Sequence, residues 1–313
     1  MREKCAFLFK TCIGVDNKWD CGTLPTAGHA GGKETGTMET TVKNLPIHYE
    51  SFGQGRPVLL IHGYSVDHRL MSGCLEPIFE TVPGYRRIYI DLPGMGKTKS
   101  APWIVNSDVM LDVVLEFIGK VIPGERFLLA GESYGGYLAR GIVHKIPERV
   151  AGVYLLCPAI IPDYDKRTLP EHRAMKVDEA LLKRLSSKEA EAFTQVHIVQ
   201  TEEMWHKFRD EILTGIQLAD MPFLKWFREN GYAFTFDVDQ LKNAFAGPSL
   251  FLLGRQDASV GYRDAWKIIE NYPRATFAVL DRAGHNLQIE QPELHASLVR
   301  EWLLRVREAM GLE

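Results

Sequence analysis

FLLAGESYGGYLARGIVHKI, residues 127–146, is the stretch of this sequence that decides the fold. Four apolar residues come first, a glycine-rich turn follows, and helical spacing of apolar residues begins at Tyr134. A G-x-S-x-G turn between a strand and a helix holds its serine on a tight, strained bend, which exposes the hydroxyl at the carboxyl end of the sheet. The turn therefore predicts that Ser133 is a nucleophile. An ordinary helix N-cap serine is the alternative.

A nucleophilic serine requires a histidine within reach, because its hydroxyl is a weak nucleophile until a base takes the proton. The sequence holds ten histidines. His285 is favoured because it follows the apolar run 276–280 in a polar, glycine-containing turn, just beyond a carboxyl strand end. His144 and His295 fall within helical patterns, where surface or satisfied core roles are expected.

The base in turn needs an acid that fixes its tautomer and stabilises its cation. Asp257 directly follows the apolar run 249–253 and precedes a helical pattern, so it is the predicted acid. A helix N-cap is its alternative role. Asp163, after the run 150–157, is the reserve acid. The order Ser133, Asp257, His285 along the chain matches the nucleophile, acid, histidine order of such sites.

Attack by a serine places negative charge on the substrate carbonyl oxygen, so backbone N–H donors must lie beside it. The apolar run 57–61 leads into the turn 62–65, HGYS, whose glycine allows a close backbone approach. The backbone N–H groups of Tyr64 and Tyr134 are the predicted oxyanion-hole donors. His62 is interpreted as a structural hydrogen-bonding residue, because the triad already contains a base.

The rest of the chain repeats a pattern of short apolar strand, glycine or proline turn and amphipathic helix, which predicts an α/β fold with a mostly parallel sheet between helices. Predicted strands are 57–61, 87–90, 127–130, 150–157, 249–253 and 276–280, with an edge strand at 42–51, and predicted helices are 108–121, 134–146, 262–271 and 293–306. Residues 158–247 break the pattern and are predicted to form a helical cap. The core of the fold then comprises 38–157 and 248–313, and 1–37 is predicted to be a flexible extension.

Charge and composition exclude several classes of function. The net charge is −3 and the pI about 6.4, so no broad basic surface is available for nucleic acid. No apolar run approaches the ~20 residues of a membrane-spanning helix. Lys10 interrupts the only signal-like stretch, so a cytoplasmic location is predicted. The five cysteines lack C-x-x-C spacing, and 94–98 lacks the first glycine of a phosphate-binding loop, so neither metal nor nucleotide cofactor is expected.

Five segments together resemble the alpha/beta-hydrolase superfamily: VLLIHGY at 58–64, DLPGMGKT at 91–98, LLAGESYGGYLAR at 128–140, LLGRQDASVG at 252–261 and DRAGHNLQIEQPE at 281–293. The resemblance implies that 91–96 is the turn after the fourth strand and that the cap forms a lid over the site. A serine at position 133 distinguishes the chain from the haloalkane dehalogenases and epoxide hydrolases that its core resembles, because those attack through an aspartate.

The cap is rich in aromatic residues, and five of them are predicted to line an apolar acyl or aryl pocket: Trp205, Phe208, Phe223, Trp226 and Phe227. Packing of the lid onto the core is the alternative role for each. The predicted activity is cofactor-free hydrolysis of a small to medium apolar carboxylic ester through an acyl-serine intermediate. Alternatives are a carbon–carbon bond (meta-cleavage product) hydrolase, a proline iminopeptidase-like amide hydrolase, and a non-catalytic hydrolase-like receptor.

Overall fold

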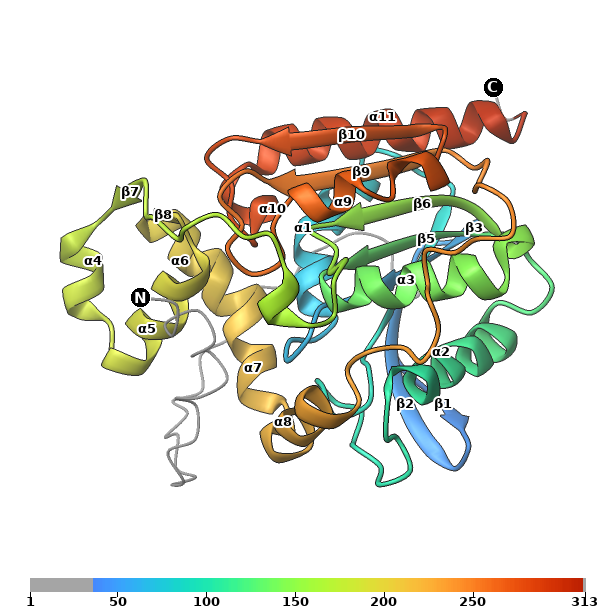
Figure 1. Ribbon diagram of the computed structural model, residues 1–313, viewed down its shortest axis with the longest axis horizontal. Helices are drawn as coiled ribbons and strands as arrows, with labels where there is room; N and C mark the ends of the chain where they lie inside the picture. The colour runs from blue at the N-terminus through green and yellow to red at the C-terminus, as the bar shows by residue number, and fades with distance from the viewer. Residues whose placement is uncertain (1–35, 312–313) are drawn as a thin grey trace.

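An eight-stranded sheet forms the centre of the computed structural model, which describes residues 36–311 (Figure 1). Its strand order is β1-β2-β4-β3-β5-β6-β9-β10. The strands are β1 (Gly36–Val42), β2 (Leu45–Phe52), β3 (Arg56–Ile61), β4 (Tyr85–Ile90), β5 (Phe127–Glu132), β6 (Val150–Leu156), β9 (Ser249–Gly254) and β10 (Ala275–Leu280). β2 is antiparallel to both β1 and β4, and the pairs from β4 to β10 are parallel. The predicted extension 1–37 lies almost wholly outside the described residues.

The edge of the sheet differs from the predicted single edge strand at 42–51. Lys43 and Asn44 have φ of +48° and +66°, a left-handed pair that makes a two-residue hairpin turn. This turn divides the segment, so Val42 ends β1 and Leu45 begins β2. β1 is therefore the edge strand, and β2 lies inside the sheet between β1 and β4.

The central strands are buried as their continuous apolar runs predict. Every residue of β5, β6 and β9 is buried. β10 is the exception, because it is the last strand of the sheet, has β9 as its one neighbour and is half-buried along its whole length. Since parallel strands all end at the same edge of a sheet, the loops after β3, β5, β9 and β10 converge there.

Helices cover both faces of the sheet (Figure 1). α1 packs against α11 on one face, and α2 packs against α3 on the other. The helices of the core are α1 (Arg69–Phe79), α2 (Ser107–Val121), α3 (Tyr134–Lys145), η2 (Pro147–Arg149), α9 (Arg263–Trp266), η5 (Ile269–Asn271), α10 (Leu287–Glu290) and α11 (Pro292–Ala309). α1 was not predicted. The single helix predicted at 262–271 is instead α9 followed by the short 3₁₀ turn η5.

Residues 158–247, which we call the cap, place their helices α4 to α8 beyond the carboxyl ends of the parallel strands (Figure 1). The last part of the cap differs, because residues 241–247 run beside the end of α3 and the first residue of β6, on the way to the start of β9. The cap contains η3 (Tyr164–Lys166), α4 (Glu179–Arg184), α5 (Ser187–Val196), α6 (Glu202–Phe208), η4 (Arg209–Leu213), α7 (Thr214–Leu218) and α8 (Met221–Asn230). It also holds a two-stranded parallel sheet that was not predicted, β7 (Lys176–Val177) and β8 (Val199–Gln200).

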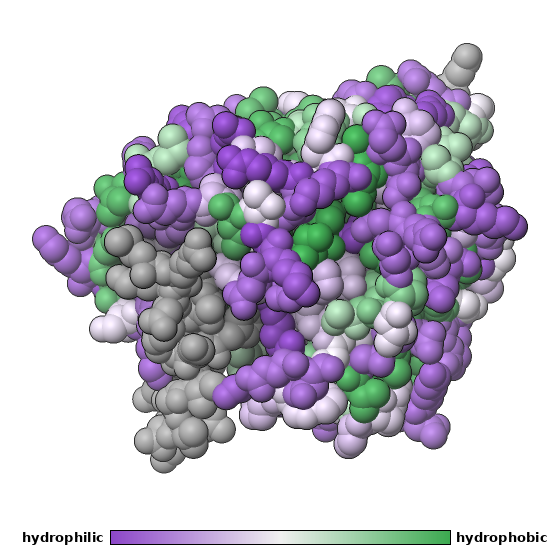
Figure 2. Space-filling view, in the orientation of Figure 1, coloured by the Kyte–Doolittle hydropathy of each residue, from purple (hydrophilic) through white to green (hydrophobic). Residues whose placement is uncertain are grey.

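The surface is mixed in character. Figure 2 shows hydrophilic residues over most of one face, with apolar residues scattered among them. Within residues 36–311, no helix combines the length and the apolar content needed to cross a membrane.

Candidate active site

Ser133 occupies a strained turn between β5 and α3. Its φ of +50° and ψ of −112° lie outside the regions that L-residues ordinarily adopt. The turn depends on its glycines, because a Cβ on Gly135 would collide with the carbonyl oxygen of Ile61. Although Ser133 stands at the N-cap position of α3, its side chain makes no capping hydrogen bond. The hydroxyl is therefore available to a partner outside the helix.

That partner is His285, in the loop after β10. Nε2 of His285 lies 3.0 Å from Oγ of Ser133, and Nδ1 lies 2.9 Å from Oδ2 of Asp257, in the loop after β9. The other carboxylate oxygen of Asp257 accepts the backbone N–H groups of Ser259 and Val260, at 2.8 and 3.0 Å. The structure thus brings the three predicted triad residues into one hydrogen-bonded chain.

The reserve acid, Asp163, lies elsewhere. Its carboxylate caps the short helix η3 by accepting the N–H of Asp165, and it pairs with Lys166 at 3.0 Å. The side chain is about half exposed. Asp257, which is completely buried, is the carboxylate that contacts His285.

Burial and the neighbouring carboxylates shift the pKa of His285 in opposite directions. Burial alone would lower the pKa of the imidazole, but the charge of Asp257, its hydrogen bond and the charge of Glu132 together raise it. Burial would likewise raise the pKa of Asp257, yet the attraction of His285 and the two backbone N–H donors lower it. Asp257 is therefore a carboxylate at neutral pH, as an orienting acid must be.

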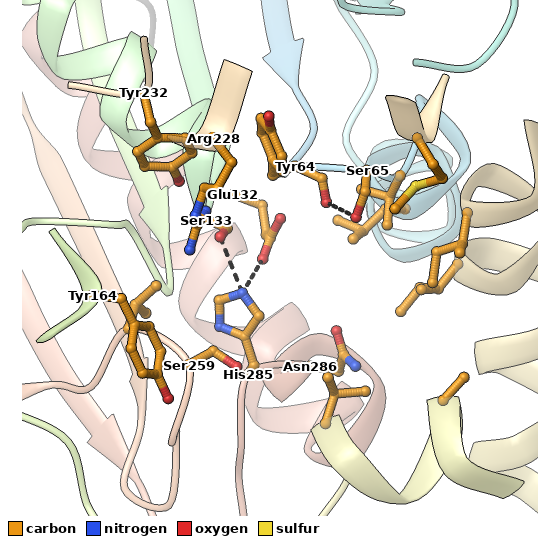
Figure 3. A pocket seen from close by; sticks show the side chains of 18 of the residues that line it. Tyr64, Ser65, Glu132, Ser133, Tyr164, Arg228, Tyr232, Ser259, His285 and Asn286 are labelled. Carbon is orange, nitrogen blue, oxygen red and sulfur yellow. Dashed lines mark hydrogen bonds and ion pairs between the residues drawn. The ribbon is translucent and has the colours of Figure 1, made fainter. Parts of the chain in front are cut away.

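Glu132 is a member of this site that was not predicted from the sequence. Its Oε1 lies 3.2 Å from Nε2 of His285, on the same side as Ser133 (Figure 3). The residue is 2% exposed, and burial raises the pKa of its carboxyl against the attraction of His285. The available signal was a charged residue at the end of a strand whose every other position is apolar or glycine.

The two predicted oxyanion-hole residues lie on neighbouring strand ends. Ile61 of β3 pairs with Gly131 of β5, which places the loop that contains Tyr64 beside the first residue of α3, Tyr134. The two tyrosine rings meet edge to face at 5.3 Å. His62, at the start of the same loop, is completely buried, and its ring nitrogens contact the carbonyl of Gly63 and accept the N–H of Leu92.

A cavity of about 460 Å³ opens beside Ser133 between the core and the cap. Phe208 lines it, but Trp205, Phe223, Trp226 and Phe227 do not, so the pocket prediction is wrong for these four. Trp205 packs against Phe193, Phe223 packs against Phe227, and Trp226 is 46% exposed. The cavity wall instead includes Tyr64, Tyr164, Tyr232, Val66, Leu70, Ile212, Ile216 and Met221.

Arg228 is one of the charged side chains of the cavity wall. Its guanidinium lies over the ring of Tyr232 at 4.2 Å and over that of Tyr64 at 5.6 Å, and it points toward Ser133 (Figure 3). Arg167 also lines the cavity, but its guanidinium donates to the carbonyls of Ile161 and Ser259. Most of the cavity's surface is apolar, and Arg167 and Arg228 add positive charge to its wall.

A second histidine, His68, also lies between two carboxylates. Nδ1 of His68 is 2.8 Å from Oδ1 of Asp91, and Nε2 is 3.3 Å from Oε1 of Glu50. Burial would lower the pKa of His68, but Asp91 and Glu50 raise it to about 9. Asp91 also accepts the backbone N–H groups of His68 and Lys97, both at 2.9 Å. These contacts join β2, the loop after β3 and the loop after β4.

Two groups of potential metal ligands occur among residues 36–311: His48 with His68 and Asp91, and Cys157 with Asp257 and His285. In each group a histidine and a carboxylate already form a hydrogen bond with each other, His68 with Asp91 and His285 with Asp257. Burial raises the pKa of Cys157, which keeps its thiol protonated. A metal would have to displace these bonds, so neither group is a preformed ligand set.

A mostly parallel sheet with a serine turn after β5 and a histidine after β10 is the architecture of alpha/beta hydrolases. Residues 56–292 match the family model for the alpha/beta hydrolase fold, and the chain belongs to that family.

Similar proteins are hydrolases of several kinds. A pimeloyl-(acyl-carrier protein) methyl ester esterase from Legionella pneumophila is 26% identical over 271 residues, which cover 83% of this chain and 100% of that protein. A 2-hydroxy-6-oxononadienedioate/2-hydroxy-6-oxononatrienedioate hydrolase from Paraburkholderia phymatum is 25% identical over 265 residues, covering 83% of this chain and 91% of that protein. The solved structure of an alpha/beta superfamily hydrolase from Oenococcus oeni has a TM-score of 0.79 and 32% identity, and covers 86% of this chain and 99% of that one.

Proposed function

We propose that this protein is a serine hydrolase that cleaves small to medium, largely apolar carboxylic esters through an acyl-serine intermediate. The observation that carries the proposal is that His285 contacts both other members of the predicted triad. Its Nε2 lies 3.0 Å from Oγ of Ser133, and its Nδ1 lies 2.9 Å from Oδ2 of Asp257. Similarity to a methyl ester esterase, which extends over the full length of that protein, supports ester cleavage.

In the proposed reaction, Oγ of Ser133 attacks the ester carbonyl carbon while Nε2 of His285 takes the hydroxyl proton. The backbone N–H groups of Tyr64 and Tyr134 stabilise the oxyanion. The carbon–oxygen bond to the alcohol then breaks, and His285 returns the proton to the departing oxygen. Water attacks the acyl-serine by the same route, which releases the carboxylic acid and restores Ser133. Asp257 keeps the Nδ1–H of His285 in place throughout.

The cavity supports a substrate of limited size. A volume of about 460 Å³ accommodates a small or medium acyl group, and side chains such as Leu70, Ile212 and Ile216 offer it apolar contact. No step of the proposed reaction requires a cofactor, because the attacking atom, the base and the oxyanion donors all belong to the chain.

A carbon–carbon bond hydrolase is the second candidate. It is favoured by the similarity to the Paraburkholderia enzyme, and the same serine, histidine and aspartate would serve it. A panel of p-nitrophenyl esters from acetate to decanoate, set beside a ring-fission diketone and a prolyl amide, separates the candidates. We expect the highest kcat/KM on an ester.

Ser133→Ala provides the test of the proposed chemistry. We expect kcat on the best ester to fall by a factor on the order of 10⁴ or more, because the variant has no atom to form the acyl intermediate. Circular dichroism and the unfolding midpoint check that the variant folds. Ester turnover that survives this change in a folded protein would contradict the proposal. If the wild-type protein turns over the diketone and none of the esters, the second candidate is favoured.

A further inference from the structure

Nε2 of His285 has two partners in the resting structure. Oγ of Ser133 lies at 3.0 Å and Oε1 of Glu132 at 3.2 Å (Figure 3). A neutral imidazole whose Nδ1–H points to Asp257 carries a lone pair at Nε2. This lone pair is suited to the Ser133 hydroxyl proton, but it repels the charged oxygen of an ionised Glu132 at 3.2 Å. A proton on Nε2 turns that repulsion into the attraction of an ion pair at 3.2 Å.

Glu132 is held in this position by the fold. It is the last residue of β5, and its pairing with Leu156 of β6 fixes the backbone. Its carboxylate receives the backbone N–H of Gly63, and a Cβ at Gly63 would collide with Oε2. The residue is 2% exposed, and it lines the cavity beside Ser133. The contact with His285 is therefore built into the site.

The charged groups around the pair come from several loops. Asp257 after β9 and Glu132 both raise the pKa of His285, whereas burial and Arg167 of the cap lower it. Around Glu132, burial and the charge of Asp257 raise the pKa of the carboxyl, and His285 and the Gly63 N–H lower it. The thiol of Cys157 is protonated because burial raises its pKa. Two carboxylates thus face one imidazole, with Arg167 as the opposing cation.

We propose that Glu132 is a second carboxylate partner of the base, which retains a proton at Nε2 of His285 in the resting site and stabilises the imidazolium that forms when Ser133 attacks. This role rests on the proposed function. At low pH the retained proton occupies the position that must accept the Ser133 proton, so the site is inactive. Once that proton has left to solvent, the same carboxylate favours its replacement by the proton of Ser133.

Two opposite effects of Glu132→Gln follow. The acid limb of the pH profile should move down by about one pH unit or more, because removal of a carboxylate within contact of an imidazole lowers its pKa. The alkaline plateau should fall by roughly tenfold, because one pKa unit of lost imidazolium stabilisation corresponds to a tenfold change in rate. The two profiles therefore cross. A residue with a merely structural role would lower the rate at every pH without moving the limb.

The measurement is the rate of labelling by a fluorophosphonate probe between pH 5 and 10, corrected for probe hydrolysis, in the full-length protein. Glu132→Gln and Glu132→Ala should show the same downward shift of the midpoint. Glu211→Gln is the matched control, because Glu211 is another largely buried glutamate whose pKa burial raises to about 7, and it packs against Gly73 of α1. We expect its midpoint to equal that of the wild type.

An unmoved midpoint in both Glu132 variants, or an equal shift in Glu211→Gln, overturns the role of Glu132 and leaves the proposed function intact. Wild-type protein that is not labelled at any pH overturns the proposed function itself. If neither Glu132 variant folds, the ¹⁵N-detected titration of the His285 imidazole in Glu132→Asp and in the wild type decides. The midpoint should be lower in Glu132→Asp, because its shorter side chain moves the carboxylate away from Nε2. An equal midpoint in the two proteins contradicts the proposal.

Discussion

His285 and His68 are two histidines in nearly the same electrostatic setting. His285 has Asp257 at 2.9 Å and Glu132 at 3.2 Å, and His68 has Asp91 at 2.8 Å and Glu50 at 3.3 Å. What differs is the third neighbour. Ser133 lies 3.0 Å from Nε2 of His285 and borders a cavity of about 460 Å³, whereas His68 is not part of the cavity wall. Under the proposed function, a histidine between carboxylates serves as a base where a strained turn adds a serine and the fold leaves room for a substrate.

The two clusters therefore predict different consequences for the same kind of substitution. Loss of a carboxylate beside His285 should affect the rate of reaction, because in the proposed mechanism that histidine changes its protonation state during each turnover. Loss of a carboxylate beside His68 should affect the free energy of unfolding, because that cluster joins three segments of the core and His68 does not line the cavity.

Asp257→Asn should produce the largest effect. The amide oxygen should stay on the backbone N–H groups of Ser259 and Val260, so the amide NH2 would donate to Nδ1 of His285 and leave the proton on Nε2. This tautomer cannot accept the Ser133 proton, so kcat/KM on the best ester should fall by about 10⁴. Steady-state kinetics measures the loss, and the unfolding midpoint shows whether the fold is kept. A variant that retains a tenth or more of wild-type kcat/KM would show that Asp257 does not orient the base.

Asp91→Asn is the corresponding change in the His68 cluster. Removing one partner of a buried ion pair leaves the other uncompensated, so the free energy of unfolding should fall by about 3 kcal/mol. The rate of ester hydrolysis by the folded fraction should change less than tenfold. Urea unfolding and kinetics on one preparation test both expectations. An unchanged unfolding free energy with a large loss of rate would reverse the roles assigned to the two clusters.

The pH dependence of stability gives a finer comparison. Because the folded state raises the pKa of His68 to about 9, its contribution is fully present below the ordinary value of 6.5 and is lost as pH rises through about 9. Wild-type stability should therefore decline more steeply over this window than that of Asp91→Asn. His285 contributes with the same sign to both proteins and cancels in the difference. Equal slopes in urea titrations from pH 6 to 10 would rule out this account of His68.

Glu50→Gln should give the smallest effect. Glu50 is the partner of His68 that corresponds to Glu132, but its side chain is 25% exposed, so solvent weakens the pair. We expect the unfolding free energy to change by less than about 1 kcal/mol. The acid limb of the labelling profile should stay at its wild-type midpoint. Movement of that limb as large as the one expected for Glu132→Gln would remove the distinction between the clusters.

The parts of the molecule that follow from local patterns were predictable from the sequence. The strands that carry Ser133 and Asp257 are continuous apolar runs that end in polar turns, and parallel strands end at one edge. The sequence therefore predicted that Ser133 and Asp257, which are 124 positions apart, lie close together at this edge, and that His285 lies there with them.

What depends on tertiary packing was not predictable. The aromatic residues of the cap have the composition of a pocket, but burial against one another places Trp205 and Phe227 away from the cavity. The contact between Glu132 and His285 joins the end of β5 to the loop after β10, which no local sequence pattern connects. The His68 cluster likewise joins β2 to two loops that no sequence period connects.

The central claim is that Ser133 is the one residue whose side chain His285 makes reactive. Treatment with a fluorophosphonate, followed by proteolysis and mass spectrometry, tests it directly. We expect one adduct, on the serine of the peptide that contains GESYGG, and none in His285→Ala at the same exposure. An adduct on a different residue, or equal labelling of Ser133 without His285, would contradict the account.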